Sequence, residues 1–403
     1  MTEALNESLT DALGMPAAQT QSAKISPISP IVQHADVGGP AQPLLAVRDI
    51  KRYFPLKKKA LGAARQFVKA VDGVSFDIRK GETLGVVGES GCGKSTTARL
   101  LMQLMKQDSG EMVFDAETVG SHALPLRRYY SQVQMVFQDS YASLNPRLTI
   151  EESIAFSPRV HNVKREEATR RAHDLLTRVG LEPARFAGRY PHELSGGQRQ
   201  RVNIARALAV NPRLVILDEA VSALDKSVEA QVLNLLLDLK ADFDLTYLFI
   251  SHDLGVVRYL CDRVLVMYLG KVVEIGDAET LFIAPQHPYT RALLSSVPSM
   301  DPDKRTLTPP LAGDPPNPVN PPSGCAFHPR CEFAEAVCAQ KAPQLLERAG
   351  HATACLMQEP GSGHSAASTI AAGQPVHLWM RDHAKVQNPM AALTPNETEE
   401  MDV

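Results

Sequence analysis

The sequence predicts an α/β fold built around a phosphate-binding loop, followed by a smaller C-terminal unit. The loop is the stretch Gly88-Glu89-Ser90-Gly91-Cys92-Gly93-Lys94-Ser95-Thr96, which follows the apolar run 83–87 and precedes a helix-forming run. A second apolar run, 214–217, ends in two carboxylates. Continuous apolar runs that end in polar residues are typical of parallel strands buried on both faces. A group of four cysteines near the C-terminus predicts the smaller unit.

The composition limits the possible classes of function. The chain has 403 residues, 44% of them hydrophobic, and a formal net charge of −3, which gives no general attraction to nucleic acid or to an acidic membrane. No apolar run approaches the ~18 residues of a spanning helix, and the first forty residues lack the pattern of an export signal. We therefore expect a cytosolic chain, in which clustered cysteines suggest metal or redox chemistry rather than disulfides.

The glycine-rich loop suits the chemistry of a nucleotide's phosphates. Glycines allow backbone N–H groups to point inward together, and the start of the following helix adds its positive dipole end. Lys94 can reach the β- and γ-phosphates, and the Ser95 hydroxyl can bind Mg²⁺. A glycine-rich turn that matches by accident is the alternative, which the preceding strand disfavours.

The elements before and after this loop are predicted in chain order. Residues 1–43 read as a disordered leader. The first strand begins at 44–47 and leads to Tyr53-Phe54, and a second strand spans 71–78. The run 133–137 predicts a further buried strand. Gln138 at its end is either a surface glutamine or a contact to metal or water.

Residues 139–191 show helical patterns and little strand signal, which predicts a helical insert. Leu194-Ser195-Gly196-Gly197-Gln198 then opens a helix over 199–210. A glycine pair at the start of a helix is either a second anion site or a plain turn.

Two strand ends carry the candidate catalytic groups. Asp218 can hold Mg²⁺, and Glu219 can polarise a water for attack on the γ-phosphate, although an acidic helix cap would look similar. The strand 247–250 leads into His252, which is a candidate because ligands of parallel sheets collect at the carboxyl ends of neighbouring strands. A structural or merely exposed histidine is the alternative.

In this order, residues 44 to about 290 resemble the nucleotide-binding subunit of ABC transporters. The resemblance implies a cassette over 44–285, with a RecA-like core, an antiparallel β subdomain and a helical subdomain at 139–191. It makes 88–96 the Walker A loop and 194–198 the signature. It assigns Gln138 as the Q-loop residue, Asp218 as the Walker B aspartate, Glu219 as the catalytic base and His252 as the switch histidine.

The resemblance also implies the ligands of the site. ATP would bind with Mg²⁺, which Ser95, Gln138 and Asp218 would hold. An aromatic side chain, Phe54 or its neighbour Tyr53, would stack on adenine. Two such subunits would close head to tail, so that Ser195 and Gly197 of one complete the γ-phosphate site of the other.

The C-terminal part contains a proline-rich segment, 302–322, which reads as an extended linker, and then Cys325, Cys331, Cys338 and Cys355. Four cytosolic thiols so close together suggest an iron–sulfur cluster or zinc. Intervals of five, six and sixteen residues differ from the paired cysteines of zinc ribbons and favour the cluster.

Other interpretations of these cysteines remain open. His328 and His351 keep zinc as the second choice, and a set of small buried residues without a ligand is the third. Cys92 and Cys261 lie elsewhere and are expected to be structural.

The segment 286–294, together with 320–325, resembles the C-terminal extension of oligopeptide/dipeptide importer ATPases. Some of these proteins carry a [4Fe-4S] cluster on equivalent cysteines. The resemblance implies an extension over 286–358, and the small, polar residues 359–403 read as a disordered tail.

The resemblance therefore implies an ATPase subunit, peripheral on the cytoplasmic face of the cell's inner membrane, that powers uptake of di- or oligopeptides or related small ligands. Its expected partners are a second similar ATPase or another copy of itself, two permease chains and an external binding protein, with no nucleic acid. Two alternatives are a non-transport ABC ATPase that acts on nucleic acid or ribosomes, and an ATPase that senses metal or redox state. One cassette and the lack of a basic stripe disfavour the first.

Overall fold

The computed structural model describes residues 34–57, 65–296, 311 and 313–383. The strands among these residues are β1 (Leu45–Pro55), β2 (Phe67–Ile78), β3 (Thr83–Val87), β4 (Ser109–Phe114), β5 (Glu117–Thr118), β6 (Val133–Val136), β7 (Leu214–Asp218), β8 (Thr246–Ile250), β9 (Arg263–Tyr268), β10 (Lys271–Asp277), β11 (Leu346–Arg348) and β12 (His351–Thr353). The helices are α2 (Lys94–Leu101), α3 (Leu126–Gln132), α4 (Ile150–Val160), α5 (Arg165–Arg178), α6 (Pro183–Phe186), α7 (Gly196–Leu208), α8 (Lys226–Phe243), α9 (Leu254–Leu260), α10 (Ala278–Ile283), α11 (Pro288–Ser295), α12 (Ala336–Gln340), α13 (Ser365–Ala371) and α14 (Val376–His383), with short 3-10 turns η1 (Pro191–Glu193), η3 (His328–Arg330) and η4 (Leu356–Gln358).

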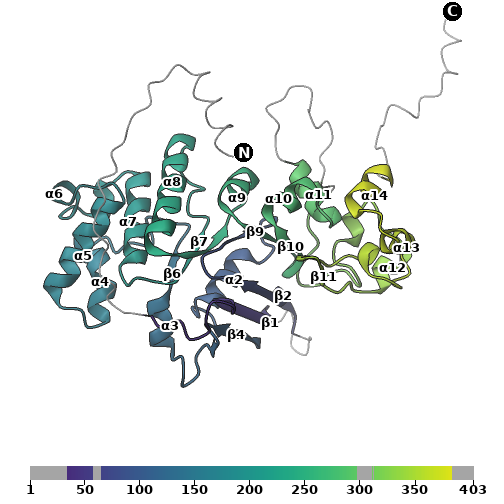
Figure 1. Ribbon diagram of the computed structural model, residues 1–403, viewed down its shortest axis with the longest axis horizontal. Coiled ribbons are helices and arrows are strands. Elements are labelled where there is room, and N and C mark those ends of the chain that lie inside the picture. The colour runs from purple at the N-terminus through teal and green to yellow at the C-terminus, as the bar shows by residue number, and fades with distance from the viewer. Residues whose placement is uncertain (1–33, 58–64, 297–310, 312, 384–403) are drawn as a thin grey trace, which may run out of the picture.

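Two sheets organise the described chain. The larger has eight strands in the order β11-β12-β10-β9-β3-β8-β7-β6, and the smaller has the order β2-β1-β4-β5. Strands β6, β7, β8, β3 and β9 are parallel, whereas all pairs in the smaller sheet are antiparallel. Figure 1 shows the smaller sheet on one side of the larger, with α7, α8 and α9 on the other. The predicted α/β fold class is confirmed.

The parallel strands are buried on both faces, which explains their continuous apolar runs. In β7, Val215 and Leu217 face a core formed with the helices. Leu214 and Ile216 face the opposite way, into a second core shared with β1, β2 and α2. Successive side chains of a strand point to opposite faces, so one run of aliphatic residues supplies both cores.

Residues 139–191 contain helices α4, α5 and α6 among the described elements. Helix α4 begins at a capping box, in which the Thr149 hydroxyl accepts from the N–H of Glu152 (3.2 Å) and the Glu152 carboxylate accepts from the N–H of Thr149 (3.0 Å). Leu175 and Leu176 of α5 are fully buried in the helical core. These helices form the left part of the molecule in Figure 1.

The C-terminal unit continues the larger sheet. Strand β12 pairs antiparallel with β10, with Glu274 opposite Thr353 and Ile275 opposite Ala352, and β11 adds one more strand. Backbone hydrogen bonds therefore join this unit to the sheet that carries the phosphate-binding loop. No helix in the described ranges is both long and apolar enough to cross a bilayer.

The structure describes parts of the segments predicted as a disordered leader and tail, residues 34–43 and 359–383. Residues 1–33 and 384–403 lie outside the described part of the chain, as do residues 302–310 and 312 of the predicted linker. The N–H groups of Val37 and Gly38 donate to the buried carboxylate of Asp115 (2.8 and 3.1 Å). Residues 365–383 form α13 and α14, whose Trp379 and Met380 pack in an apolar cluster with Phe333. Residues 37–38 and α13–α14 thus make specific contacts with other parts of the fold, through Asp115 and Phe333.

Candidate nucleotide-binding site

The phosphate-binding loop connects β3 to α2 and requires glycine at two close approaches. Gly88 has φ 147°, and a Cβ there would lie 2.2 Å from the carbonyl oxygen of Met267. Gly93 has φ 111°, and its Cβ would lie 2.4 Å from the carbonyl oxygen of Ala70. Any side chain at either position would displace the loop from the ends of β9 and β2.

The other predicted residues of this loop differ in their exposure to solvent. Ser90 and Gly91 are exposed, Cys92 is buried, and Ser95 and Thr96 are partly buried at the start of α2. Gly91 has φ 79°, and a Cβ there would meet no atom within 4 Å, so its glycine serves conformation rather than space. Phosphate contacts of these residues remain predictions.

Lys94 lies inside the loop. Its side chain is buried, and Nζ donates to the carbonyl oxygens of Gly88 (2.7 Å) and Glu89 (3.1 Å). These two carbonyls hold the ammonium group inside the phosphate-binding loop. A phosphate oxygen can replace them without large movement of the side chain, because Lys carries three rotatable donors.

Asp218 at the carboxyl end of β7 lies next to Ser95. The Ser95 hydroxyl donates to Oδ1 of Asp218 (3.0 Å), although the two residues are 123 positions apart. Burial raises the pKa of Asp218 above its usual value, and the Ser95 hydroxyl partly offsets this effect. A hydroxyl and a carboxylate side by side form an oxygen-rich site that fits Mg²⁺.

Glu219 follows Asp218 with an uncommon backbone conformation. Its φ is 48°, in the left-handed region, and its N–H donates to the carbonyl oxygen of Ile250 (3.0 Å). Its Oε2 accepts from the Gln138 amide (2.8 Å) and lies 3.6 Å from Nδ1 of His252. The structure thus brings together three side chains that the sequence predicts as catalytic, from the ends of β6, β7 and β8.

The predicted signature lies at the start of α7. Ser195 caps this helix, with its hydroxyl accepting from the N–H of Gln198 (3.3 Å) and its N–H donating to the Gln198 carboxamide (3.0 Å). Gly196 and Gly197 form the first turn, and a Cβ on Gly197 would lie 2.5 Å from Cγ1 of Val228. Within the described part of a single chain, neither Ser195 nor Gln198 hydrogen bonds to the phosphate-binding loop. The structure therefore does not bring these two predicted anion sites together within one subunit.

The two aromatic candidates for adenine lie on β1. Tyr53 pairs with Lys69 of β2, one residue before Ala70, whose carbonyl contacts Gly93. The Tyr53 hydroxyl donates to Asp72, and the Lys69 ammonium lies 5.9 Å from the Tyr53 ring. Phe54 packs under the Arg52 guanidinium (5.1 Å). Neither contact decides between the two rings, and adenine stacking remains a prediction.

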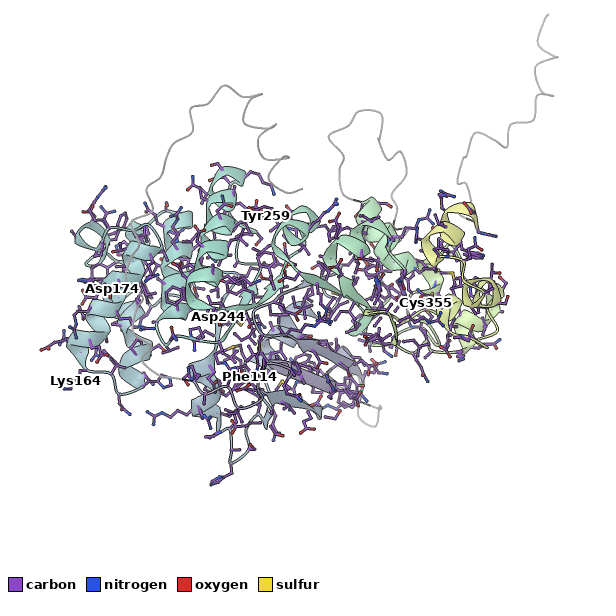
Figure 2. The ribbon with its side chains drawn as sticks, in the orientation of Figure 1. Phe114, Lys164, Asp174, Asp244, Tyr259 and Cys355 are labelled. Carbon is purple, nitrogen blue, oxygen red and sulfur yellow. The ribbon has the colours of Figure 1, made fainter. Side chains whose placement is uncertain are left out.

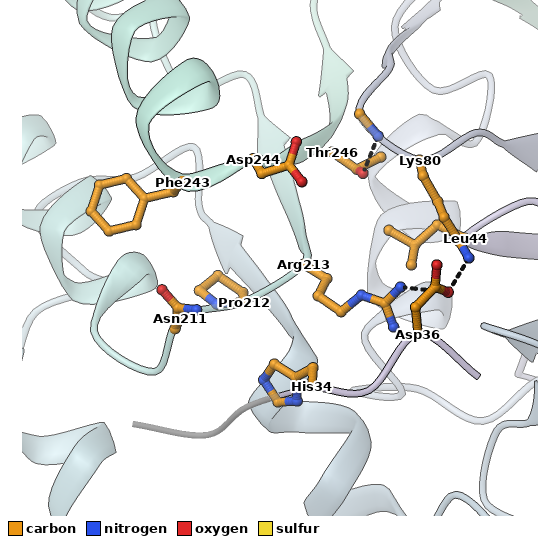
Figure 3. Close-up of a pocket in the computed structure, with 11 residues that line it drawn as sticks. His34, Asp36, Leu44, Lys80, Asn211, Pro212, Arg213, Phe243, Asp244 and Thr246 are labelled. Atoms are coloured by element: carbon orange, nitrogen blue, oxygen red, sulfur yellow. Dashed lines mark hydrogen bonds and ion pairs between the residues drawn. The ribbon is translucent and has the colours of Figure 1, made fainter. Parts of the chain in front are cut away.

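A separate cavity of about 590 Å³ lies at the other end of the strands. Its lining includes Arg213 and Thr246, which precede or begin β7 and β8 (Figure 3). Gly81, which precedes β3, also contributes to the lining. Ligands of parallel sheets bind beyond the carboxyl ends of the strands, and this cavity is at the amino ends. Ion pairs link Arg213 and Lys80 to Asp36 and Asp115, so these four charged groups are already paired.

The four C-terminal cysteines line one small, mainly apolar pocket. Its walls include Cys325, Cys331, Cys338 and Cys355. Cys355 lies in the C-terminal unit at the right of Figure 2. Burial, followed by the nearness of the other three thiols, raises its pKa well above the usual range. The described residues include no group of three or more His, Cys, Asp or Glu side chains arranged to hold a metal ion.

The candidate histidines of this pocket differ from those expected. His328 lines it, but its Nδ1 lies 2.9 Å from the carbonyl oxygen of Cys325. His351 instead pairs with the buried Glu274 (2.7 Å). His364, which no sequence pattern indicated, lines the pocket and hydrogen bonds Cys338; this bond, against the effect of burial, lowers the pKa of Cys338. Arg330 and Tyr289 were not predicted as site residues either, and both contact Glu89 of the phosphate-binding loop.

Two family models match the chain. Residues 71–222 match the model described as ABC transporter, and residues 273–338 match the model described as Oligopeptide/dipeptide transporter, C-terminal region.

Curated relatives match over most of their length. The chain is 50% identical over 322 residues to the oligopeptide transport ATP-binding protein AppF of Bacillus subtilis, covering 77% of this chain and 96% of AppF. It is 48% identical over 317 residues to a putative peptide import ATP-binding protein of Brucella ovis, covering 78% of this chain and 98% of that protein.

Solved structures with a similar fold include a dimeric, post-hydrolysis state of the ATP-binding cassette MJ0796 bound to ADP and Pi. The TM-score is 0.50 at 29% identity, over 58% of this chain and 98% of that one. Another is cbiO1 of Clostridium perfringens, part of the transporter complex cbiONQ, with a TM-score of 0.51 at 26% identity, over 60% of this chain and 91% of that one.

Proposed function

Because the chain belongs to the ATP-binding proteins of ABC peptide transporters, we propose that it hydrolyses ATP to drive uptake of di- or oligopeptides, or related small ligands, through a membrane permease. The observation that carries this proposal is the junction of Ser95, Asp218 and Glu219 at the carboxyl ends of the parallel strands. This arrangement supports a magnesium site at Ser95 and Asp218, with Glu219 as the candidate base beside the phosphate-binding loop.

The side chains divide the reaction between them. When ATP binds, the Lys94 ammonium exchanges its hydrogen bonds with the Gly88 and Glu89 carbonyls for hydrogen bonds with phosphate oxygens. Its positive charge then compensates the negative charge of the phosphates. Ser95 and Asp218, with Gln138, would hold Mg²⁺, which neutralises charge that develops on the phosphates. Glu219 accepts a proton from the attacking water.

Hydrolysis would take place in a closed dimer. Ser195 is exposed at the start of α7, and the N–H groups of Gly196 and Gly197 point from a helix start, where an anion is favourable. In a head-to-tail pair, with a second ATPase of this type or another copy, this signature would cover the γ-phosphate of the partner. The exposed position of Ser195 supports the proposal.

The transporter would contain two permease chains and take its solute from an external binding protein. This subunit would lie on the cytoplasmic face of the inner membrane and contact the permease through the helical part at 139–191. Exposed apolar side chains there, Tyr141, Phe156 and Val160, are available to a protein partner. No described feature favours nucleic acid or ribosomes.

For the four-cysteine pocket we propose a [4Fe-4S] cluster, with Zn²⁺ as the alternative. The support for this proposal is that four thiols line one pocket, although the described residues include no group arranged to hold a metal ion. Anaerobically purified protein should be brown and contain about four irons; colourless protein with one zinc would contradict the cluster.

The function is tested by uptake of a labelled peptide in cells that contain the permease, the binding protein and this subunit. We expect uptake with the native chain and none with Lys94→Ala or Glu219→Gln. An exposed ion-pair variant, Arg258→Ala, serves as the control. ATP-dependent uptake that persists in both site variants would contradict the proposal.

A further inference from the structure

The C-terminal unit contacts the phosphate-binding loop directly. Arg330 forms a two-point ion pair with Glu89, the second residue of that loop, at 2.7 Å (NH1 to Oε2) and 3.0 Å (NH2 to Oε1). The residues are 241 positions apart, and the Arg330 side chain is only 6% exposed. A bidentate guanidinium–carboxylate pair fixes orientation as well as distance.

A second contact holds the backbone of the same residue. The N–H of Glu89 donates to the hydroxyl oxygen of Tyr289 in α11 (2.8 Å), and Tyr289 is fully buried. The C-terminal unit therefore holds Glu89 by both its side chain and its main chain.

An aromatic cluster connects these contacts to the cysteines. Phe327 lies between Cys325 and Cys331 in sequence, and its ring packs against Tyr268 (5.3 Å) and Tyr289 (5.4 Å). Arg330 directly precedes Cys331, in the tight turn η3. Phe327 and Arg330 both belong to the 325–331 segment, so a shift of this segment would disturb the contacts that they make with Tyr289 and Glu89.

Glu89 in turn determines the geometry of the loop. Its carbonyl oxygen accepts from the Lys94 ammonium (3.1 Å) and from the N–H of Cys92 (3.2 Å). We propose that Arg330 and Tyr289 are positioning residues of the phosphate-binding loop, and that through them the 325–331 segment sets the affinity of the site for ATP. The proposal goes beyond the transport function and does not require a particular metal in the pocket.

Calorimetric titration of the full-length protein with ATP tests the first part. Arg330→Ala should raise the Kd for ATP about tenfold, which corresponds to the free energy that a hydrogen bond to a charged group usually contributes. In the assembled transporter the KM for ATP should rise while kcat at saturating ATP stays within about twofold, since Arg330 does not touch the reacting atoms. Arg330→Lys should recover part of the loss, because it restores the charge but not the two-point geometry.

Matched variants separate positioning from general damage. Arg258→Ala removes a two-point pair with Glu279 on the surface and should leave the Kd unchanged. The double variant Glu89→Gln/Arg330→Ala should bind ATP no more weakly than the single variant with the larger loss of affinity, because both substitutions remove the same interaction. If Arg330→Ala lowers thermal stability but leaves the Kd of ATP unchanged, its role is only structural and the proposal fails.

Hydrogen exchange tests the link to the cysteine segment. Coupling is reciprocal, so a non-hydrolysable ATP analogue should slow amide exchange in 325–331 of the native chain and much less in Arg330→Ala. Equal protection in both proteins would overturn the coupling. Lys94→Ala distinguishes this inference from the proposed function. If Lys94→Ala still binds ATP, the assigned nucleotide site is wrong. If Lys94→Ala loses ATP binding while Arg330→Ala leaves the Kd for ATP unchanged, only this inference is contradicted.

Discussion

The Gln138 side-chain amide donates a 2.8 Å hydrogen bond to the carboxylate of Glu219, across 81 positions of sequence. The two residues follow adjacent parallel strands, β6 and β7, and their side chains meet where those strands end. Gln138 also begins the segment that leads into the helical part of the chain. A movement of those helices can therefore reach the candidate base through a single hydrogen bond.

Replacement of Glu219 by Gln should leave ATP binding intact and lower hydrolysis about 10²- to 10⁴-fold, the contribution of a positioned general base. The amide keeps the shape of the side chain but cannot accept the proton. Single-turnover hydrolysis and sedimentation with ATP measure both effects, and we expect an ATP-bound dimer to accumulate. Glu279→Gln, on the surface, is the control. Near-normal turnover would remove Glu219 from its assigned role.

Gln138→Ala should reduce kcat about tenfold, because the Glu219 carboxylate loses a hydrogen bond that orients it. The Kd for ATP without Mg²⁺ should stay close to that of the native protein. Gln103→Ala is a suitable control, since that amide donates to Leu100 instead. Unchanged kcat in Gln138→Ala would show that the 2.8 Å contact has no part in catalysis.

Gly197→Ala should destabilise the fold by about 1–3 kcal/mol through overpacking. The added Cβ would lie 2.5 Å from Cγ1 of Val228, whereas a Cβ on Gly196 has its nearest contact at 3.9 Å. Urea unfolding of both variants measures the difference, and Gly196→Ala should cost much less. Adding Val228→Ala to Gly197→Ala should relieve the overlap; if it does not, the overlap is not the cause.

Acid should destabilise the protein through His287. Burial lowers the pKa of His287 from 6.5 to about 4. Between these two pH values the imidazole is therefore protonated in the unfolded chain and neutral in the folded chain. The stabilisation is complete above pH 6.5 and is lost progressively as the pH falls towards 4, by ~3 kcal/mol. The free energy of unfolding, measured in urea at several pH values across this range, should depend less steeply on pH in His287→Gln than in the native protein. His122→Gln, at an exposed position, should keep the native slope.

Local patterns predicted much of this structure. The strands before Lys94, Gln138, Glu219 and His252 are readable because each is a continuous apolar run that ends in a polar group, and parallel topology then brings those ends together. The contact between Arg330 and Glu89 could not be predicted in this way, since neither residue is unusual in its own segment. Pairing over 241 positions depends on how the C-terminal unit docks on β10, which no local pattern encodes.

The tail was mispredicted for a related reason. Residues 365–383 are mostly small and polar, and isolated helices of this length are marginal in water. Trp379 and Met380 are buried against Phe333, which is more than forty positions away in the sequence. The order of this segment is therefore supplied by its partner rather than by its own sequence.

That position of Trp379 has a practical consequence. It is the only tryptophan of the chain, stacks on His383 with ring centroids 4.2 Å apart, and belongs to an apolar cluster that Cys331 and Cys355 also contact. The protein thus carries an intrinsic fluorophore beside the cysteine pocket and no indole at the nucleotide site. Its emission spectrum therefore reports, without any label, on changes beside the cysteine pocket.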